Sequence, residues 1–154
     1  MQRAAAVLGV ALAVSACGTF NSKSEDLRED VVETALDQVG EDYEYGGSNP
    51  SDGFDCSGLV QYSYAEHGIR LPRTAAGQRN AGTHIKMGDA KPGDLLFYNF
   101  PGVKPNGWHV VMYLGDGEGV HAPTSDKGEV EKIDITKKHW RERFVGATRV
   151  IRGD

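Results

Sequence analysis

Cysteine and histidine are the residues of this chain whose spacing best fits a reaction. The 154 residues include two cysteines, Cys17 and Cys56, and five histidines. Cys56 lies where a glycine-rich stretch ends and a pattern typical of a helix begins. A helix start presents unpaired backbone N–H groups and the positive end of the helix dipole, and both favour a thiolate over a thiol. We therefore expect Cys56 to be an ionised nucleophile.

A cysteine nucleophile needs a base, and histidine titrates nearest to neutral pH. His109 begins an apolar run typical of a strand, and His121 lies in the next such run. Side chains of a strand alternate between its two faces. A three-residue loop at residues 115–117 would therefore place both histidines on one face. One ring could then serve as the base while the other holds its orientation, as in a catalytic triad.

The residues alone leave two other interpretations open. His109 and His121 could be half-buried strand residues that bind only backbone groups. Alternatively, Cys56 and the two histidines could be three zinc ligands, although the chain has no CxxC or HxxxH pair that would preorganise such a site. We expect no metal and no cofactor.

The elements that must position these residues follow from hydrophobic periodicity and turn residues. A capping box at residues 22–25 predicts a helix that ends near Gly40. Residues 43–53 predict a glycine-rich loop without regular structure. Further helices are expected at residues 56–67, 74–81 and 136–141, and strands at 94–98, 108–114, 119–122, 130–135 and 145–151. This order predicts an α+β fold, with N-terminal helices packed on an antiparallel sheet of about five to six strands.

The N-terminus has the pattern of a processing signal. Arg3 precedes an apolar run at residues 4–14, which is too short to span a membrane permanently. The sequence Val-Ser-Ala-Cys then ends at Cys17 and resembles a bacterial lipobox. We expect a signal peptide at 1–16, a lipidated Cys17 with a tether at 17–24, and one domain at 25–154. The alternative is an ordinary secretory signal followed by an unrelated cysteine.

Composition narrows the choice of partners. The chain has 17 Lys+Arg against 22 Asp+Glu, a formal net charge of −5, which argues against general nucleic-acid binding. One basic cluster, at residues 137–141, is expected to be a solvated helix face. If Cys17 carries lipid, Cys56 has no disulfide partner within the chain, and a free thiol kept in an oxidising compartment indicates a chemical role.

Six blocks of sequence occur in the order found in the NlpC-type bacterial cell-wall cysteine peptidases. They are YEYGG at 43–47, DCSGLV at 55–60, LPRTAAGQ at 71–78, PGDLLF at 92–97, HVVMYLG at 109–115 and VHA at 120–122. The chain resembles this papain-like family over nearly the whole of residues 25–151. The resemblance implies a peptidase that hydrolyses amide bonds of peptidoglycan stem peptides, typically between D-glutamate and a diamino acid.

The resemblance also assigns roles to individual residues. It implies Cys56 as nucleophile, His109 as general base and His121 as the polar orienting residue. Tyr45 would lie near the oxyanion, with a packing role as the alternative. Two further residues, Asp55 and Ser57, would hold a free amine of the stem peptide, although Asp55 also suits a helix cap. Arg73 would meet a substrate carboxylate or form a surface salt bridge.

Other functions stay open at this point. An amidase or acyltransferase of the envelope would use the same three residues, and a non-catalytic envelope-binding module would use none of them as catalysts. The expected partners are peptidoglycan stem peptides and a membrane reached through the lipid. No motif identifies a regulatory protein. The expected location is the cell envelope: the periplasmic face of the outer membrane in a Gram-negative organism, otherwise the outer face of the cell membrane. The Pro/Gly-rich residues 99–107 are expected to form one wall of the cleft.

Overall fold

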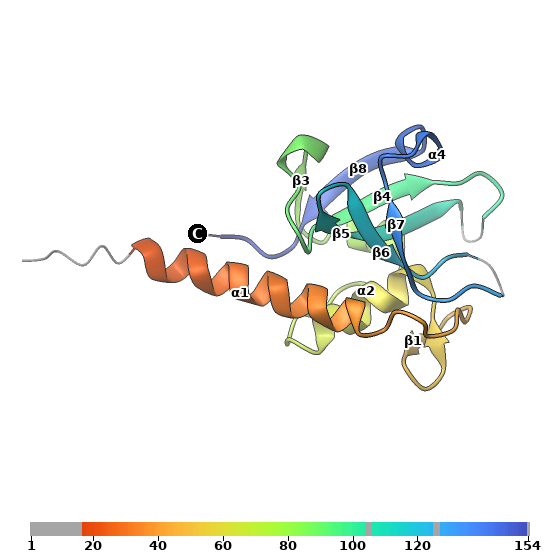
Figure 1. The fold of residues 1–154 in the computed structure, drawn as a ribbon, viewed down its shortest axis with the longest axis horizontal. Helices are drawn as coiled ribbons and strands as arrows, with labels where there is room; N and C mark the ends of the chain where they lie inside the picture. The colour runs from red at the N-terminus through yellow and green to blue at the C-terminus, as the bar shows by residue number, and fades with distance from the viewer. Residues whose placement is uncertain (1–16, 104–105, 125–126, 154) are drawn as a thin grey trace, which may run out of the picture.

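The computed structural model describes residues 17–103, 106–124 and 127–153, with side chains from residue 22 onward (Figure 1). Its elements are α1 (Cys17–Leu36), β1 (Ser48–Asn49), β2 (Gly53–Phe54), α2 (Cys56–Ala65), α3 (Ala75–Arg79), β3 (Thr83–Ile85), the 3₁₀ turn η1 (Met87–Asp89), β4 (Leu95–Asn99), β5 (Trp108–Gly115), β6 (Glu118–His121), β7 (Glu131–Asp134), α4 (Lys138–Arg141) and β8 (Phe144–Arg149).

The main sheet has six strands in the order β3-β8-β4-β5-β6-β7, and every neighbouring pair is antiparallel. The α+β fold with an antiparallel sheet of five to six strands is therefore confirmed. The helices that begin at Cys56 and after Thr74 are also confirmed, since Asp55 and Thr74 cap them by accepting backbone N–H groups.

Three details of the sequence prediction are wrong. Helix α1 begins at Cys17, so the residues expected as a capping box lie inside the helix. The segment expected to lack regular structure contains a small hairpin, in which β1 pairs with β2. Strand β3 was not predicted at all; it is short, partly exposed and paired only with the distant β8, which no local pattern reveals. The expected signal peptide lies outside the described residues, as does the side chain of Cys17.

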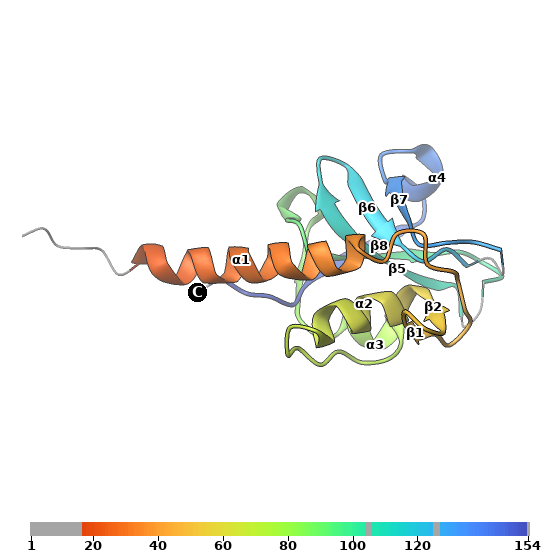
Figure 2. The ribbon, with the colours of Figure 1, turned by 60° about the horizontal axis from the view of Figure 1, so that its bottom comes forward.

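Helices cover both faces of the sheet, in unequal amounts. Figure 2 shows α1 and α2 side by side on one face and the short α4 on the other. The larger core lies on the side of α1 and α2 and includes Val31, Ala35, Leu59, Val60, Leu95, Phe97, Val110, Met112 and Val120. The smaller core lies under α4 and includes Leu96, Tyr98, Val111, Ile135, Trp140 and Ala147. Strand β4 is apolar at successive positions because alternate side chains enter the two cores.

A buried carboxylate joins α1 to the sheet. Asp94 has no exposed surface and accepts hydrogen bonds from Arg28 Nη1 at 2.9 Å and from Arg149 Nη2 at 2.7 Å. Arg28 also donates to the Ile151 carbonyl. Because both side chains that bind Asp94 are cationic, its charge is compensated without water. The cluster fixes the long helix against β4 and β8, and the sequence analysis missed it.

Among the described helices, none combines the length and the apolar content that crossing a membrane requires.

Candidate active site

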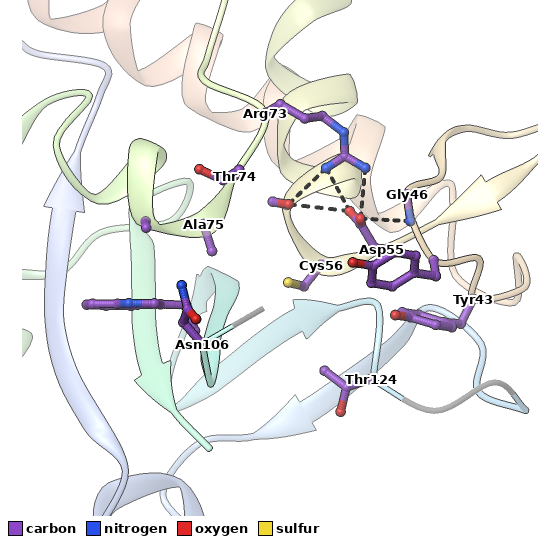
Figure 3. Close-up of a pocket in the computed structure, with 13 residues that line it drawn as sticks. Tyr43, Gly46, Asp55, Cys56, Arg73, Thr74, Ala75, Asn106 and Thr124 are labelled. Carbon is purple, nitrogen blue, oxygen red and sulfur yellow. Dashed lines mark hydrogen bonds and ion pairs between the residues drawn. The ribbon is translucent and has the colours of Figure 1, made fainter. Parts of the chain in front are cut away.

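Cys56 opens onto a cavity of about 410 Å³ between the helices and the sheet. In Figure 3 its sulfur lies between Arg73, Thr74 and Ala75 on one side and Asn106 and Thr124 on the other. The cavity is also lined by Tyr43, Tyr45, Gly46, Asp55, Ser57, Ala76 and Trp108. Asn106 and Trp108 confirm that the segment before His109 contributes a wall.

Local backbone chemistry places Cys56 in the first turn of α2. Asp55 adopts an extended backbone and its Oδ1 accepts the Gly58 N–H at 2.7 Å, which ends the loop and starts the helix. Gly58 packs so closely on the Gly47 carbonyl that a Cβ would overlap it. The glycine therefore allows the loop, whose neighbouring residue Gly46 lines the cavity, to lie against the helix start.

A hydrogen-bonded cluster occupies the helix side of the cavity. Arg73 forms a bidentate ion pair with Asp55, in which Nη1 lies 2.9 Å from Oδ1 and Nη2 lies 2.8 Å from Oδ2. Nη1 also donates to Ser57 Oγ at 2.9 Å. The backbone N–H of Gly46 donates to Asp55 Oδ2 at 3.1 Å (Figure 3). Three of the predicted substrate-binding residues, Asp55, Ser57 and Arg73, thus lie together, and in the free protein they bind one another.

The environment of the Cys56 sulfur differs from the sequence expectation. Burial raises the pKa of the thiol to about 11, and the nearby charge of Asp55 adds to the increase. Hydrogen bonds from the backbone N–H groups of Val110 and Ser57, and the charge of Arg73, lower the pKa without reversing that result. Burial thus opposes the ionisation that the position at a helix start was expected to favour. The helix start supplies donors, but the loss of water around the sulfur outweighs them.

The two predicted histidines lie together, as expected. His109 Nε2 and His121 Nδ1 are 2.7 Å apart, and both residues are buried. The hairpin achieves this with a two-residue turn at Asp116 and Gly117, both with positive φ, and a bulge before it on β5. The bulge adds one residue, so the strands keep the pairing that a three-residue loop would give. Both rings consequently lie on one face.

The remaining nitrogens of the pair have distinct surroundings. His121 Nε2 lies 3.3 Å from Glu131 Oε1 on β7, a partner that the sequence analysis missed. His109 Nδ1 is buried and has no hydrogen-bond partner among the described residues. Burial, together with the charge of His121, keeps the pKa of His109 well below its usual range. The pKa of His121 is also lowered, by burial first, although Glu131 opposes the shift.

Aromatic rings enclose the histidine pair. The ring centroid of Trp140, on α4, lies 5.9 Å from that of His109 and 5.3 Å from that of His121, and Phe100 meets His109 edge-on at 5.8 Å. The basic stretch of residues 137–141 is therefore only partly a solvated face. Its lysines are exposed, but Trp140 is buried and covers both imidazoles. The single tryptophan among the basic residues of this stretch is the sequence feature that could have indicated a buried position.

Cys56 lies against strand β5, next to the position of His109 in the sequence of that strand. The sulfur accepts the N–H of Val110, the residue that directly follows His109, whereas neither histidine lines the cavity itself. The nucleophile and the unpartnered imidazole nitrogen thus come from adjoining parts of the fold. Within the described part of the chain, no group of three or more His, Cys, Asp or Glu residues is placed to hold a metal ion.

Two tyrosines line the cavity, although the sequence analysis selected only Tyr45. The side chain of Tyr45 is 66% exposed at the rim, whereas Tyr43 is partly buried. Tyr43 is thus a second candidate for a hydroxyl that faces the reacting group. The spacing YxY in one loop could have indicated both residues.

Comparisons with known proteins match this sequence and fold. The model of the NlpC/P60 family matches residues 40–149. The chain is 40% identical over 127 residues to the bifunctional muramidase/DL-endopeptidase CwlT of Bacillus subtilis, covering 82% of this chain and 38% of that protein. It is 42% identical over 137 residues to the peptidoglycan endopeptidase RipB of Mycobacterium tuberculosis, covering 80% of this chain and 53% of RipB. The chain therefore spans only part of the length of these relatives.

Solved structures show the same arrangement. The peptidoglycan hydrolase RipB of Mycobacterium tuberculosis superposes with a TM-score of 0.71 at 35% identity, covering 85% of this chain and 68% of that one. A Staphylococcus aureus protein described as similar to lipoprotein, NLP/P60 family, gives 0.74 at 33% identity, covering 83% and 42%. Together with the family match over most of the domain, these similarities show that the chain belongs to the NlpC/P60 family.

Proposed function

We propose that this protein is a cysteine peptidase that hydrolyses amide bonds in peptidoglycan stem peptides, with the D-glutamyl–diamino acid bond as the target. The observation that carries the proposal is the placement of Cys56 in a cavity at a helix start, against strand β5, whose second residue is the buried His109. The relatives named as DL-endopeptidase and peptidoglycan endopeptidase support the substrate class.

In this mechanism the resting Cys56 is a neutral thiol and His109 a neutral imidazole. As the substrate carbonyl approaches, the thiol proton passes to the unpartnered Nδ1 of His109 while the sulfur attacks the carbonyl carbon. Backbone N–H groups in the first turn of α2, and a tyrosine hydroxyl from Tyr43 or Tyr45, would donate to the developing oxyanion.

The second half of the reaction reverses the proton transfer. The imidazolium of His109 gives its proton to the leaving amine, which leaves an acyl-enzyme on Cys56. Water then gives a proton to His109 and attacks the thioester, so the acid product leaves and the thiol is restored. His121 holds the His109 ring throughout through its 2.7 Å contact.

The anchor is a second part of the proposal. We propose that Cys17 carries the lipid and that the protein works at the surface of an envelope membrane. Helix α1 starts at Cys17 and has 20 residues, so it would extend over about 30 Å at 1.5 Å per residue. In Figure 1 the β1–β2 hairpin, next to the start of α2, lies at the end of the molecule away from Cys17. This arrangement would direct the cavity away from the membrane.

The test is digestion of purified peptidoglycan by the wild type, by Cys56→Ala and by Ser63→Ala. Ser63 is a matched control because it lies on the same helix and its hydroxyl binds only the Leu59 carbonyl of that helix. Cys56→Ala should release no muropeptides while its unfolding curve stays close to that of the wild type, and Ser63→Ala should stay active. Activity retained by Cys56→Ala would refute the proposal.

Mass spectrometry of the released fragments separates the alternatives. A cut between D-glutamate and a diamino acid leaves a free diamino-acid amine, whereas an amidase that separates glycan from peptide leaves a complete stem with a free N-terminal alanine. An acyltransferase would join the stem to an added amine and would release little acid product.

A further inference from the structure

The partner of His121 on strand β7 places a carboxylate next to the histidine pair. His121 and Glu131 are directly opposite each other in the β6–β7 pairing, and Nε2 lies 3.3 Å from Oε1. Glu131 is more than half exposed, with 57% of its side chain accessible, whereas His121 is 5% exposed. The carboxylate thus contacts solvent on one side and a buried imidazole on the other. Glu131 does not line the cavity at Cys56.

The hydrogen-bond donors and acceptors of Glu131, His121 and His109 allow one arrangement of protons. An ionised carboxylate only accepts, so His121 Nε2 must carry the hydrogen that it shares with Glu131. Neutral His121 then has a lone pair on Nδ1, which accepts a hydrogen from His109 Nε2 at 2.7 Å. A neutral imidazole carries only one hydrogen. His109 Nδ1, the buried atom without a partner, is therefore left with its lone pair.

The reverse arrangement shows what the carboxylate prevents. If His121 carried its hydrogen on Nδ1, it would donate to His109 Nε2, and the hydrogen of His109 would move to Nδ1. That nitrogen could not then accept a proton from a thiol. The hydrogen bond between the two rings can form in either arrangement, so that contact alone does not select between them. Water at the place of the carboxylate would both donate and accept, so it would set no preference.

We propose that Glu131 is a positioning residue that holds the hydrogen of His121 on Nε2 and thereby keeps the Nδ1 lone pair of His109 free to act as the base. The catalytic consequence rests on the proposed function, whereas the arrangement of protons in the pair does not. Glu131 acts through His121 and contacts neither Cys56 nor the cavity.

Few other ionisable groups face His121. His109 faces it from β5 and Glu131 from β7, and the residue of α4 that packs against it is Trp140, which does not titrate. The pair of Glu118 and Lys132, 3.2 Å apart, lies on the same two strands. Side chains alternate along a strand, so Glu118 and Lys132 project from the face opposite to His121 and Glu131. Glu118 is thus a matched control, because it is a similarly exposed carboxylate.

The first experiment measures the tautomers without substrate. Nitrogen-15 NMR of the imidazoles distinguishes a protonated ring nitrogen from an unprotonated one. The wild type should show hydrogens on Nε2 of both His109 and His121. Glu131→Leu should show a mixture of tautomers for both rings, and Glu118→Leu should match the wild type. A hydrogen on Nδ1 of His109 in the wild type, or unchanged spectra in Glu131→Leu, would overturn the proposal.

The second experiment measures catalysis as a function of pH for the same variants and for Glu131→Gln. Carboxylates that orient the histidine ligands of metal ions typically contribute about 10–100-fold to activity, and we take that range for a carboxylate that orients a catalytic histidine pair. We expect Glu131→Leu to lose kcat by that factor with an unchanged KM. Glu131→Gln replaces one acceptor oxygen with an NH₂ donor, so it favours the Nε2 hydrogen of His121 less strongly and should lose less kcat than Glu131→Leu but more than Glu118→Leu.

Both substitutions remove a negative charge that favours protonation of His121, whose Nδ1 lies 2.7 Å from His109 Nε2. A proton taken up by His109 at low pH is then less well stabilised across this contact, so the acid limb of the rate profile should move to lower pH in both variants. A purely structural role of Glu131 would lower activity without moving that limb, and this result would also refute the proposal. If Cys56→Ala stays active while the NMR results are as expected, the proposed function fails and the assignment of the protons stands.

Discussion

Arg73 holds both carboxylate oxygens of Asp55, with Nη1 2.9 Å from Oδ1 and Nη2 2.8 Å from Oδ2. Backbone N–H groups of Gly46 and Gly58 occupy further acceptor positions of the same carboxylate. The charge of Asp55 is therefore already neutralised, and its oxygens already have donors. This arrangement bears directly on the expectation that Asp55 would bind a free amine of the stem peptide.

We predict that the protein does not depend on such an amine. An incoming amine would have to displace Arg73 from its two contacts with Asp55, and the new pair would only replace the one that is lost. A tenfold change corresponds to about 1.4 kcal/mol. Stem peptides with free and with acetylated N-termini should therefore differ in kcat/KM by less than about tenfold. A preference for the free amine well above that factor would show that substrate displaces Arg73 from Asp55.

The pH dependence of the reaction should be broad. The neutral thiol and neutral imidazole are the reactive pair, so activity should fall at low pH only when His109 takes up a proton. Its lowered pKa places that limb below the ordinary histidine value of about 6.5. The raised pKa of Cys56 keeps the thiol protonated up to about 11. The profile of kcat/KM, which reports the free enzyme, checks this. A narrow profile that falls again between pH 8 and 9 would instead indicate a thiolate–imidazolium pair.

Alkylation of Cys56 gives an independent measure of the same property. Because burial holds the thiol protonated, the rate with iodoacetamide should keep rising through pH 9 and 10. A rate that is already constant at pH 6 would contradict the raised pKa.

Trp140 should affect both stability and activity, because it is buried and packs on both histidine rings. Truncating a buried tryptophan to alanine typically costs about 3–5 kcal/mol. We expect a loss of that size for Trp140→Ala in urea unfolding, together with reduced kcat below the unfolding transition. Trp140→Phe keeps an aromatic ring and should lose less of both. Val145→Ala, at an exposed position, is the control and should change stability by less than about 0.5 kcal/mol.

Asp94 should affect stability rather than chemistry. Asp94→Asn leaves Arg28 and Arg149 without their shared charge partner, and breaking a buried pair typically costs about 3–5 kcal/mol. At temperatures where the variant stays folded, its kcat should match that of the wild type, because the cluster lies outside the cavity at Cys56. Glu142→Gln breaks an exposed pair with Lys138 and should change stability by less than about 1 kcal/mol. Equal effects of the two substitutions would contradict this account.

The sequence by itself determined the local features of this protein. Asp55 and Thr74 mark helix starts because each side chain accepts a backbone N–H three residues ahead, a relationship contained in a few residues. The shared face of His109 and His121 follows from strand alternation and a short hairpin, which also span few residues. The family resemblance rests on such blocks and their order.

Only the tertiary structure decided how those residues are surrounded. The thiol of Cys56 was expected to ionise from its position at a helix start, but its pKa depends on how much water the sheet and loops remove from the sulfur. The contacts of Glu131 and Trp140 with the histidines, and of Arg28 with Asp94, join segments far apart in the chain. Capping and alternation act between near neighbours and can be read from a sequence, whereas desolvation and long-range pairing depend on which distant segments come together.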